Sequence, residues 1–141
     1  INGGEAAPGG GGVLGVDYFY PSNDLIDYFT GDKAMGIIRV PFSWENVQPT
    51  LNGALSSADV AELVRVVQRA NNDAVVILDC HNFAEYNGVN FGVGAVTQAA
   101  FNDLWSRMAA VFKYYSNAWF GIMNEPINAA NARIISTGIS R

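Results

Sequence analysis

The stretch Ala74-Val75-Val76-Ile77-Leu78-Asp79-Cys80-His81-Asn82 changes abruptly from apolar to polar side chains. Its first five residues form a continuous apolar run rich in β-branched side chains, which predicts a buried strand of a parallel sheet. The polar side chains of Asp79, His81 and Asn82 then mark the carboxyl end of that strand.

Two further segments repeat this design. The run Gly36-Ile37-Ile38-Arg39-Val40-Pro41-Phe42 is β-branched and is closed by a proline, so it predicts a second short strand. Residues 119–123 form a third apolar run, after which the polarity changes again at Asn124-Glu125-Pro126. Short apolar strands with polar side chains near their carboxyl ends are therefore predicted three times along the chain.

Long amphipathic helices are predicted between these strands. Ser56 and Asp59 form a capping-box pattern ahead of an apolar stripe that runs to residue 67. Thr97 caps a second helix, in which apolar residues recur at three- and four-residue spacing as far as residue 115.

Shorter helices are predicted outside this central part. One covers residues 23–29, capped by Ser22 or Asn23 and ended by Gly31. The other covers residues 127–137, after the third strand.

Strands that alternate with amphipathic helices predict right-handed βαβ units and a parallel sheet. Counting the start of the chain, we find about four βα units in 141 residues. A (β/α)₈ barrel needs eight such units and typically about 250 residues. We therefore expect an α/β fold with a single domain, residues 1–141. It is either the first half, about (βα)₄, of a TIM barrel or a small open sheet of the doubly wound type.

Composition restricts the kind of partner. Hydrophobic residues make up 50% of the chain, as expected for a folded domain, and one cysteine cannot build a disulfide framework. The net charge of −5 argues against nucleic acid and against an anionic membrane surface, because both attract clustered Lys and Arg. No apolar run is long enough to span a membrane, and the first residues lack the pattern of a secretory signal, so we expect any signal peptide to be gone.

Polar side chains follow three predicted strands at their carboxyl ends: Arg39, then His81 and Asn82, then Asn124 and Glu125. In parallel α/β sheets these ends converge on one face, where substrates bind. Taken singly, each has a structural explanation, since an arginine can pair with a carboxylate of the sheet and a lone histidine is more often a core residue. Together they favour a functional site.

Glu125 is the residue with the clearest chemical role. The order Asn124-Glu125-Pro126 directly after a strand places a carboxylate at the mouth of the sheet, where it can act as a general acid. The alternative is a helix N-cap. Asp79 lies two residues before His81, so on a strand both point the same way and Asp79 can orient the imidazole, although we favour a structural hydrogen bond there.

Aromatic residues gather in the predicted loops. Loop aromatics with few charges suit a ligand with broad faces and hydroxyl edges, such as a sugar chain, although core packing explains at least half of them. The aromatic residues concerned are Tyr18, Tyr20, Phe42, Trp44, Phe83 and Tyr86.

Phosphate and metal signatures are weak or missing. The patterns GxxxxGK[ST] and GxGxxG do not occur, so no nucleotide cofactor is predicted. His81 has no second histidine and no HExxH context, so we expect no metal.

Four ordered segments resemble glycoside hydrolase family 5, especially the secreted endo-β-1,4-glucanases of fungi. A lone Asn-Glu-Pro is weak support, but the ordered set is strong, and the similarity is strongest between Tyr18 and Pro126. The segments are Ile37-Ile38-Arg39-Val40-Pro41-Phe42-Ser43-Trp44-Glu45, Ile77-Leu78-Asp79-Cys80-His81-Asn82-Phe83, Tyr86-Asn87-Gly88 and Gly121-Ile122-Met123-Asn124-Glu125-Pro126.

The resemblance implies a secreted (β/α)₈-barrel enzyme that cleaves β-1,4-glucan with retention of configuration. Glu125 would be the acid/base, and Asn124 would bind the hydroxyl next to the scissile bond. Arg39 and His81 would order the surroundings of the nucleophile. The implied substrate contacts are Asn82, Trp44 and Tyr86.

The nucleophile is the missing part of this assignment. Retaining hydrolysis needs a second carboxyl group about 5 to 5.5 Å from the first. In the family that Glu arrives on the seventh strand, and no other carboxylate of this sequence matches its motif. Two other hypotheses are therefore kept: an inactive half-barrel that binds sugar, and an open α/β binding domain unrelated to glycosidases.

A half-barrel leaves strand edges and an apolar inner face open. We therefore expect self-association, or pairing with a second barrel half.

Overall fold

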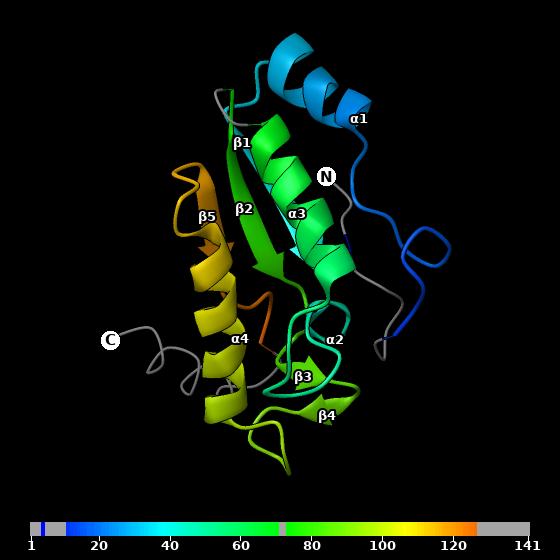
Figure 1. Ribbon diagram of the computed structural model, residues 1–141, viewed down its shortest axis with the longest axis vertical. Coiled ribbons are helices and arrows are strands. Elements are labelled where there is room, and N and C mark those ends of the chain that lie inside the picture. The colour runs from blue at the N-terminus through cyan, green and yellow to red at the C-terminus, as the bar shows by residue number, and fades with distance from the viewer. Residues whose placement is uncertain (1–3, 5–10, 71–72, 127–141) are drawn as a thin grey trace.

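The computed structural model contains a parallel sheet flanked by helices (Figure 1). The residues it describes are 4, 11–70 and 73–126. The strands of the sheet are β1 (Ile37–Phe42), β2 (Val75–Cys80) and β5 (Ala118–Gly121).

Neighbouring strands of this sheet are also neighbours along the chain. The order is β1-β2-β5, and both pairs are parallel. On the other side of β1, Gly4 forms an isolated parallel bridge with Phe42. The sequence predicts a strand at the start of the chain, and among the described residues this part of the chain contributes the bridge at Gly4.

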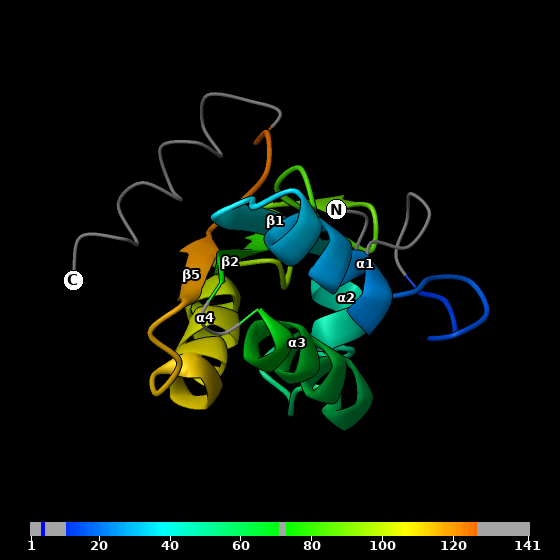
Figure 2. The same cartoon turned by 90° about the horizontal axis from the view of Figure 1, so that it is seen from above.

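Two long helices cover one face of the sheet. Figure 2 shows α3 (Ser57–Arg69) and α4 (Gln98–Phe112) side by side beneath the three strands. A doubly wound sheet reverses its strand order and carries helices on both faces. Sequential strands with helices on one face instead form the first part of a barrel, which decides between the two predicted architectures.

The long helices begin where the sequence predicts. The Ser56 hydroxyl oxygen accepts the N–H of Asp59 at 3.4 Å, and the Thr97 hydroxyl oxygen accepts the N–H of Ala100 at 3.2 Å. Each bond satisfies one of the backbone donors that a helix leaves without a partner in its first turn. None of the described helices has both the length and the apolar composition that a bilayer crossing requires.

The first short helix differs from its prediction. Ser22 caps α1 (Asn23–Asp27) by accepting the N–H of Leu25 at 3.3 Å, as expected. Gly31 does not end it, because a π-helical turn, η1 (Tyr28–Asp32), continues the chain past that glycine. The helix predicted over residues 127–137 lies outside the described residues.

The carboxyl ends of the strands carry short elements. The loop after β1 contains α2 (Trp44–Val47), and the loop after β2 contains the hairpin of β3 (Glu85–Tyr86) and β4 (Val89–Asn90). The third strand ends at Gly121, two residues earlier than predicted, and its last pair is Asp79 with Gly121.

The sheet buries one of its two faces. Side chains of a strand alternate between faces, and those of β1 and β2 that point toward the helices are almost completely buried. They are Ile38, Val40, Phe42, Val76, Leu78 and Cys80.

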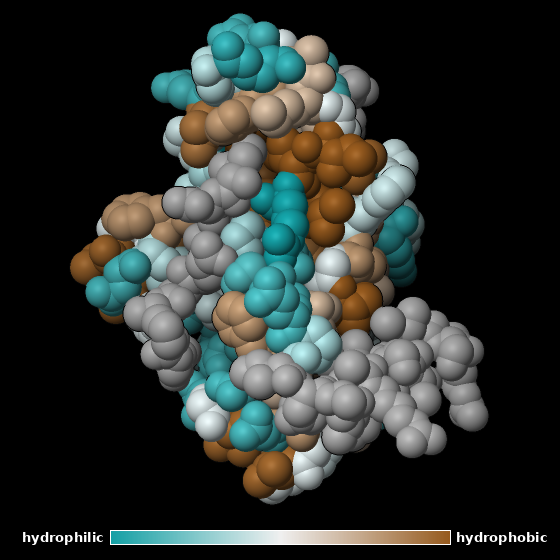
Figure 3. Space-filling view, turned by 180° about the vertical axis from the view of Figure 1, so that it is seen from behind, coloured by the Kyte–Doolittle hydropathy of each residue, from teal (hydrophilic) through white to brown (hydrophobic). Residues whose placement is uncertain are grey.

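The opposite face is open, whereas the apolar runs predicted strands buried on both faces. Ile37 is 56% exposed and Trp119 is 54% exposed. The described residues place no second layer over them, and Figure 3 shows hydrophobic and hydrophilic atoms exposed together on the side away from the helices.

Two tyrosines attach the loop before α1 to the start of α3. The hydroxyls of Tyr18 and Tyr20 donate to Oδ1 of Asp59 at 2.8 and 3.1 Å, and all three residues are buried. Burial is the largest cause that raises the pKa of both phenols above the ordinary value of 10.0, and the adjacent Asp59 adds to it. Both phenols therefore keep their protons in the folded state at neutral pH.

We expect the protein to lose stability as the pH rises above about 10. In the unfolded chain the phenols ionise near their ordinary pKa, whereas in the folded chain they hold their protons to higher pH. The contribution of the two tyrosines to folding stability is complete below their ordinary pKa and is lost as the pH rises above it. Urea unfolding at about pH 8 and about pH 11 measures the loss, which should be smaller in a Tyr18→Phe/Tyr20→Phe variant. An equal loss in the variant contradicts the assignment to these phenols.

Candidate active site

Four polar side chains form one hydrogen-bonded cluster at the carboxyl end of the sheet. Arg39 Nη2 donates to Asp79 Oδ2 at 2.6 Å and to Asn124 Oδ1 at 2.5 Å. His81 Nδ1 lies 2.8 Å from Asp79 Oδ2, and His81 Nε2 lies 3.3 Å from Asn124 Nδ2. The predicted convergence of Arg39, His81 and Asn124 is therefore present, while their catalytic roles stay predictions.

Backbone hydrogen bonds hold the cluster beyond the ends of the strands. The N–H of His81 donates to the carbonyl of Phe42 at 2.9 Å, and the N–H of Asn124 donates to the carbonyl of Cys80 at 2.8 Å. These bonds tie each site residue to the neighbouring strand. The sheet thus fixes the positions from which the side chains reach one another.

Glu125 lies next to this cluster without joining it. Its side chain is exposed, and its backbone φ is 41°. Positive φ is uncommon for a residue other than glycine, and such conformations concentrate at functional sites. A ligand can reach this carboxylate directly, as a general acid requires.

Asn82 connects two loops and does not face solvent. Its Oδ1 accepts the N–H of Trp44 at 2.6 Å, and its Nδ2 donates to Glu45 Oε2 at 2.6 Å. Glu45 in turn accepts the N–H of Asn87 at 2.5 Å. Asn82 is buried and protein partners occupy its amide, and its implied role as a substrate contact stays a prediction.

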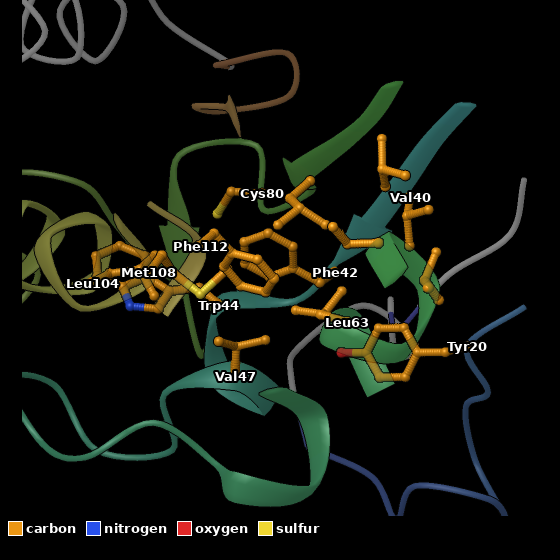
Figure 4. Close-up of a cluster of buried hydrophobic side chains, with 14 of the residues drawn as sticks. Tyr20, Val40, Phe42, Trp44, Val47, Leu63, Cys80, Leu104, Met108 and Phe112 are labelled. Carbon is orange, nitrogen blue, oxygen red and sulfur yellow. The ribbon is translucent and has the colours of Figure 1, made fainter. Parts of the chain in front are cut away.

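Trp44 and Tyr86 are also buried, and their implied roles as substrate contacts stay predictions. Trp44 is 0% exposed, and its Nε1 donates to Gln48 Oε1 at 3.0 Å. Its ring lies 5.1 Å from that of Tyr86 and 5.4 Å from that of Phe101. Figure 4 shows Trp44 within the core cluster, and the contacts of its ring with Tyr86 and Phe101 pack the interior.

Phe83 is an aromatic side chain that remains accessible beside the cluster. It is 37% exposed, and its ring lies 5.2 Å from the His81 ring. Phe83 and Ala84 both have positive φ, 52° and 63°, so two successive residues adopt a conformation that non-glycine residues rarely take. The sequence marks Phe83 only as one loop aromatic among several, and it does not distinguish the exposed ring from the buried ones.

Metal ligands do not gather in the part of the chain that the structure describes. No group of three or more His, Cys, Asp or Glu side chains there is arranged to hold an ion. The imidazole and the carboxylate of the cluster, His81 and Asp79, face each other instead. The cluster is therefore organised by hydrogen bonds.

Sequential parallel strands, helices on one face and an exposed carboxylate at the strand ends define an α/β-barrel protein with an acidic site at its mouth. The chain belongs to the cellulase family, glycosyl hydrolase family 5, whose model matches residues 7–137.

Relatives and solved structures agree with this membership. The endoglucanase EG-II of Hypocrea jecorina is 39% identical over 103 residues, which cover 72% of this chain. A triple-mutant endo-β-1,4-glucanase from Xanthomonas axonopodis pv. citri superposes with a TM-score of 0.87 and 40% identity over 99% of this chain. XacCel5A in complex with cellopentaose gives a TM-score of 0.82 and 41% identity over 91% of this chain.

The chain spans only part of each of these proteins. The matched region is 25% of the Hypocrea jecorina enzyme. It is 47% of the Xanthomonas axonopodis chain and 43% of the XacCel5A chain. The fold described above is therefore under half of a solved barrel.

Proposed function

We propose that the protein is a retaining endo-β-1,4-glucanase in which Glu125 is the acid/base. The observation that carries the proposal is the exposed Glu125 carboxylate directly after Asn124, which is held by Arg39 and His81 at the strand ends. The relatives that bear endoglucanase names, and the cellopentaose bound to one neighbour, support a β-glucan substrate.

In this mechanism Glu125 protonates the oxygen of the leaving sugar and later removes a proton from the attacking water. Asn124 binds the hydroxyl next to the scissile bond through the second hydrogen of Nδ2, since Asn124 is only half-buried and one of the two hydrogens faces His81. Phe83 takes the stacking role first assigned to Trp44, because its ring is accessible and an apolar sugar face packs well on an aromatic ring.

The nucleophile has to be a further carboxylate. Asp79 is buried against Arg39 and His81, and Glu45 is buried against Asn82 and Asn87. Neither carboxylate can approach an anomeric carbon while it holds these partners. Because no carboxylate of this sequence matches the motif of the nucleophile, the proposal assigns attack to a Glu that these 141 residues do not contain, and hydrolysis requires a protein that supplies it.

The test is release of reducing ends from a soluble β-1,4-glucan by the purified protein, with an α-1,4-glucan as the control polymer. Release from the β-linked polymer alone is the expected result. Release from neither polymer, together with binding of cellopentaose, would replace the proposed activity with the sugar-binding alternative. Because such polymers do not cross membranes, the proposal includes a secreted protein.

We also propose that the 141-residue chain self-associates through the open face of its sheet. The exposed Ile37 and Trp119 lie on that face, and exposed apolar surface of this kind favours association. Sedimentation at micromolar concentration should show a dimer or larger species, and Trp119→Asp should shift it toward monomer. A wild-type monomer contradicts the proposal.

A further inference from the structure

Asp79 is the residue of the cluster to which the proposed mechanism gives no part. It lies in β2, is 4% exposed, and uses one oxygen, Oδ2, for two partners. Arg39 Nη2 lies 2.6 Å from that oxygen and His81 Nδ1 lies 2.8 Å from it.

The two hydrogens of Arg39 Nη2 determine whether His81 Nδ1 donates or accepts a hydrogen bond. This nitrogen carries two hydrogens, and three polar atoms of the described residues lie near it: Asp79 Oδ2 at 2.6 Å, Asn124 Oδ1 at 2.5 Å and His81 Nδ1 at 3.2 Å. The two shorter contacts take both hydrogens. His81 Nδ1 is therefore not an acceptor for Arg39, and it donates its own proton to Asp79 Oδ2.

Asn124 determines whether the other ring nitrogen of His81, Nε2, carries a proton. Because Asn124 Oδ1 accepts from Arg39, the amide nitrogen of Asn124 is the atom that faces His81 Nε2, at 3.3 Å. An amide nitrogen only donates, so Nε2 has to be the unprotonated nitrogen. Both sides of the ring thus require the same neutral tautomer, with its proton on Nδ1.

The strand next to β2, β5, leaves room for the Asp79 carboxylate and its two hydrogen bonds. Gly121 of β5 pairs with Asp79, and a Cβ atom at position 121 would lie 2.8 Å from Asp79 Oδ1 and 3.2 Å from both Asp79 Cα and Cβ. A larger residue would have to push the Asp79 carboxylate away from its partners. Gly121 is therefore required for the position of Asp79.

We propose that Asp79, with Gly121 beside it, is a positioning residue that holds His81 in its Nδ1–H tautomer and directs Arg39 toward Asn124. Asp79 does not contact the substrate in this role. Its effect on catalysis rests on the proposed function, whereas its effect on the His81 tautomer does not.

The tautomer can be measured directly, because His81 is the only histidine of the sequence. Nitrogen-15 NMR of the imidazole distinguishes Nδ1–H from Nε2–H. The wild-type protein should show Nδ1–H. In Asp79→Ala the freed hydrogen of Arg39 can turn to Nδ1 at 3.2 Å and oppose a proton there, while Asn124 still opposes a proton on Nε2. Neither tautomer is then held, and the spectrum should change from Nδ1–H alone to a mixture of Nδ1–H and Nε2–H.

Two further variants separate positioning from general disruption. Asp79→Asn keeps an oxygen that accepts both donors, so it should retain Nδ1–H even if Asp79→Ala does not fold. Gly121→Ala keeps the carboxylate but displaces it, so it should show the same mixture of tautomers as Asp79→Ala. Asp27→Ala, which removes the exposed partner of Arg69, is the matched control and should leave the ring unchanged. Nε2–H in the wild type, or Nδ1–H as the sole tautomer in both Asp79→Ala and Gly121→Ala, overturns the proposal.

Activity supplies an independent readout. Because displacement of a catalytic arrangement by about 1 Å costs on the order of 100-fold in rate, we expect kcat of folded Asp79→Ala to fall about 10- to 100-fold with a smaller change in KM. Asp79→Asn should recover much of the loss. The absence of hydrolysis in the wild type would overturn the proposed function and leave the tautomer result standing.

Discussion

Replacement of Glu125 by Gln is expected to lower the rate of reducing-end release by about 10² to 10⁴-fold. Gln keeps the shape of the side chain but has no proton to give to the leaving oxygen. Since Glu125 is exposed and stands outside the hydrogen-bonded cluster, the substitution should leave folding unchanged. Equal circular dichroism and equal unfolding midpoints of the two proteins check this condition.

Glu85→Gln is the matched control for this experiment. Glu85 begins the hairpin that follows β2, so its carboxylate lies in a loop at the same end of the sheet. Its replacement should change the rate little. A large loss of activity in Glu85→Gln, together with full activity in Glu125→Gln, would show that Glu125 is not the general acid and would contradict the mechanism.

Trp44→Ala is expected to destabilise the fold by about 3 to 5 kcal/mol, the usual cost of removing a large buried aromatic side chain. Trp44 is completely buried, contacts the rings of Tyr86 and Phe101, and hydrogen-bonds Gln48 through Nε1. The free energy of unfolding in urea measures this loss. Any loss of glucan binding in Trp44→Ala should be explained by the smaller fraction of folded protein.

Phe83→Ala provides the comparison. The Phe83 ring is partly exposed, so its removal should cost much less stability while it weakens binding of cellopentaose. Trp44→Ala with wild-type stability and selectively lost binding would restore Trp44 as a substrate contact.

The order and type of the main elements follow from local sequence. The apolar run before Asp79 and the caps at Ser56 and Thr97 depend on spacing and side-chain type. The strand and the two long helices that they predict are present with small shifts at their ends. Gly31 shows the limit of local rules, because the chain closes a π-helical turn through that glycine.

The convergence of Arg39, His81 and Asn124 could also be predicted. Parallel strands bring their carboxyl ends together whatever the details of packing, so polar residues after successive strands have to meet. The hydrogen bonds among them follow this rule.

The fate of the aromatic side chains could not be predicted from residue type. Trp44 and Phe83 both follow a strand in the sequence, yet Trp44 is completely buried whereas Phe83 is 37% exposed. The difference arises because α2 turns Trp44 inward toward α4, while positive φ at Phe83 turns the chain at the edge of the site. Burial depends on which elements pack together, and local spacing does not contain that information.

The sequence by itself therefore determined the parallel α/β class, the helix starts and the polar strand ends, because these depend on neighbours within a few residues. Only the tertiary structure decided that the strands follow one another in order with the long helices on one face, as in the first part of a barrel. It also decided that Asn82, Trp44 and Tyr86 are buried, and that Asp79 holds both Arg39 and His81. These features depend on contacts between residues about 40 positions apart, such as Arg39 with Asp79, and the fold brings such residues together.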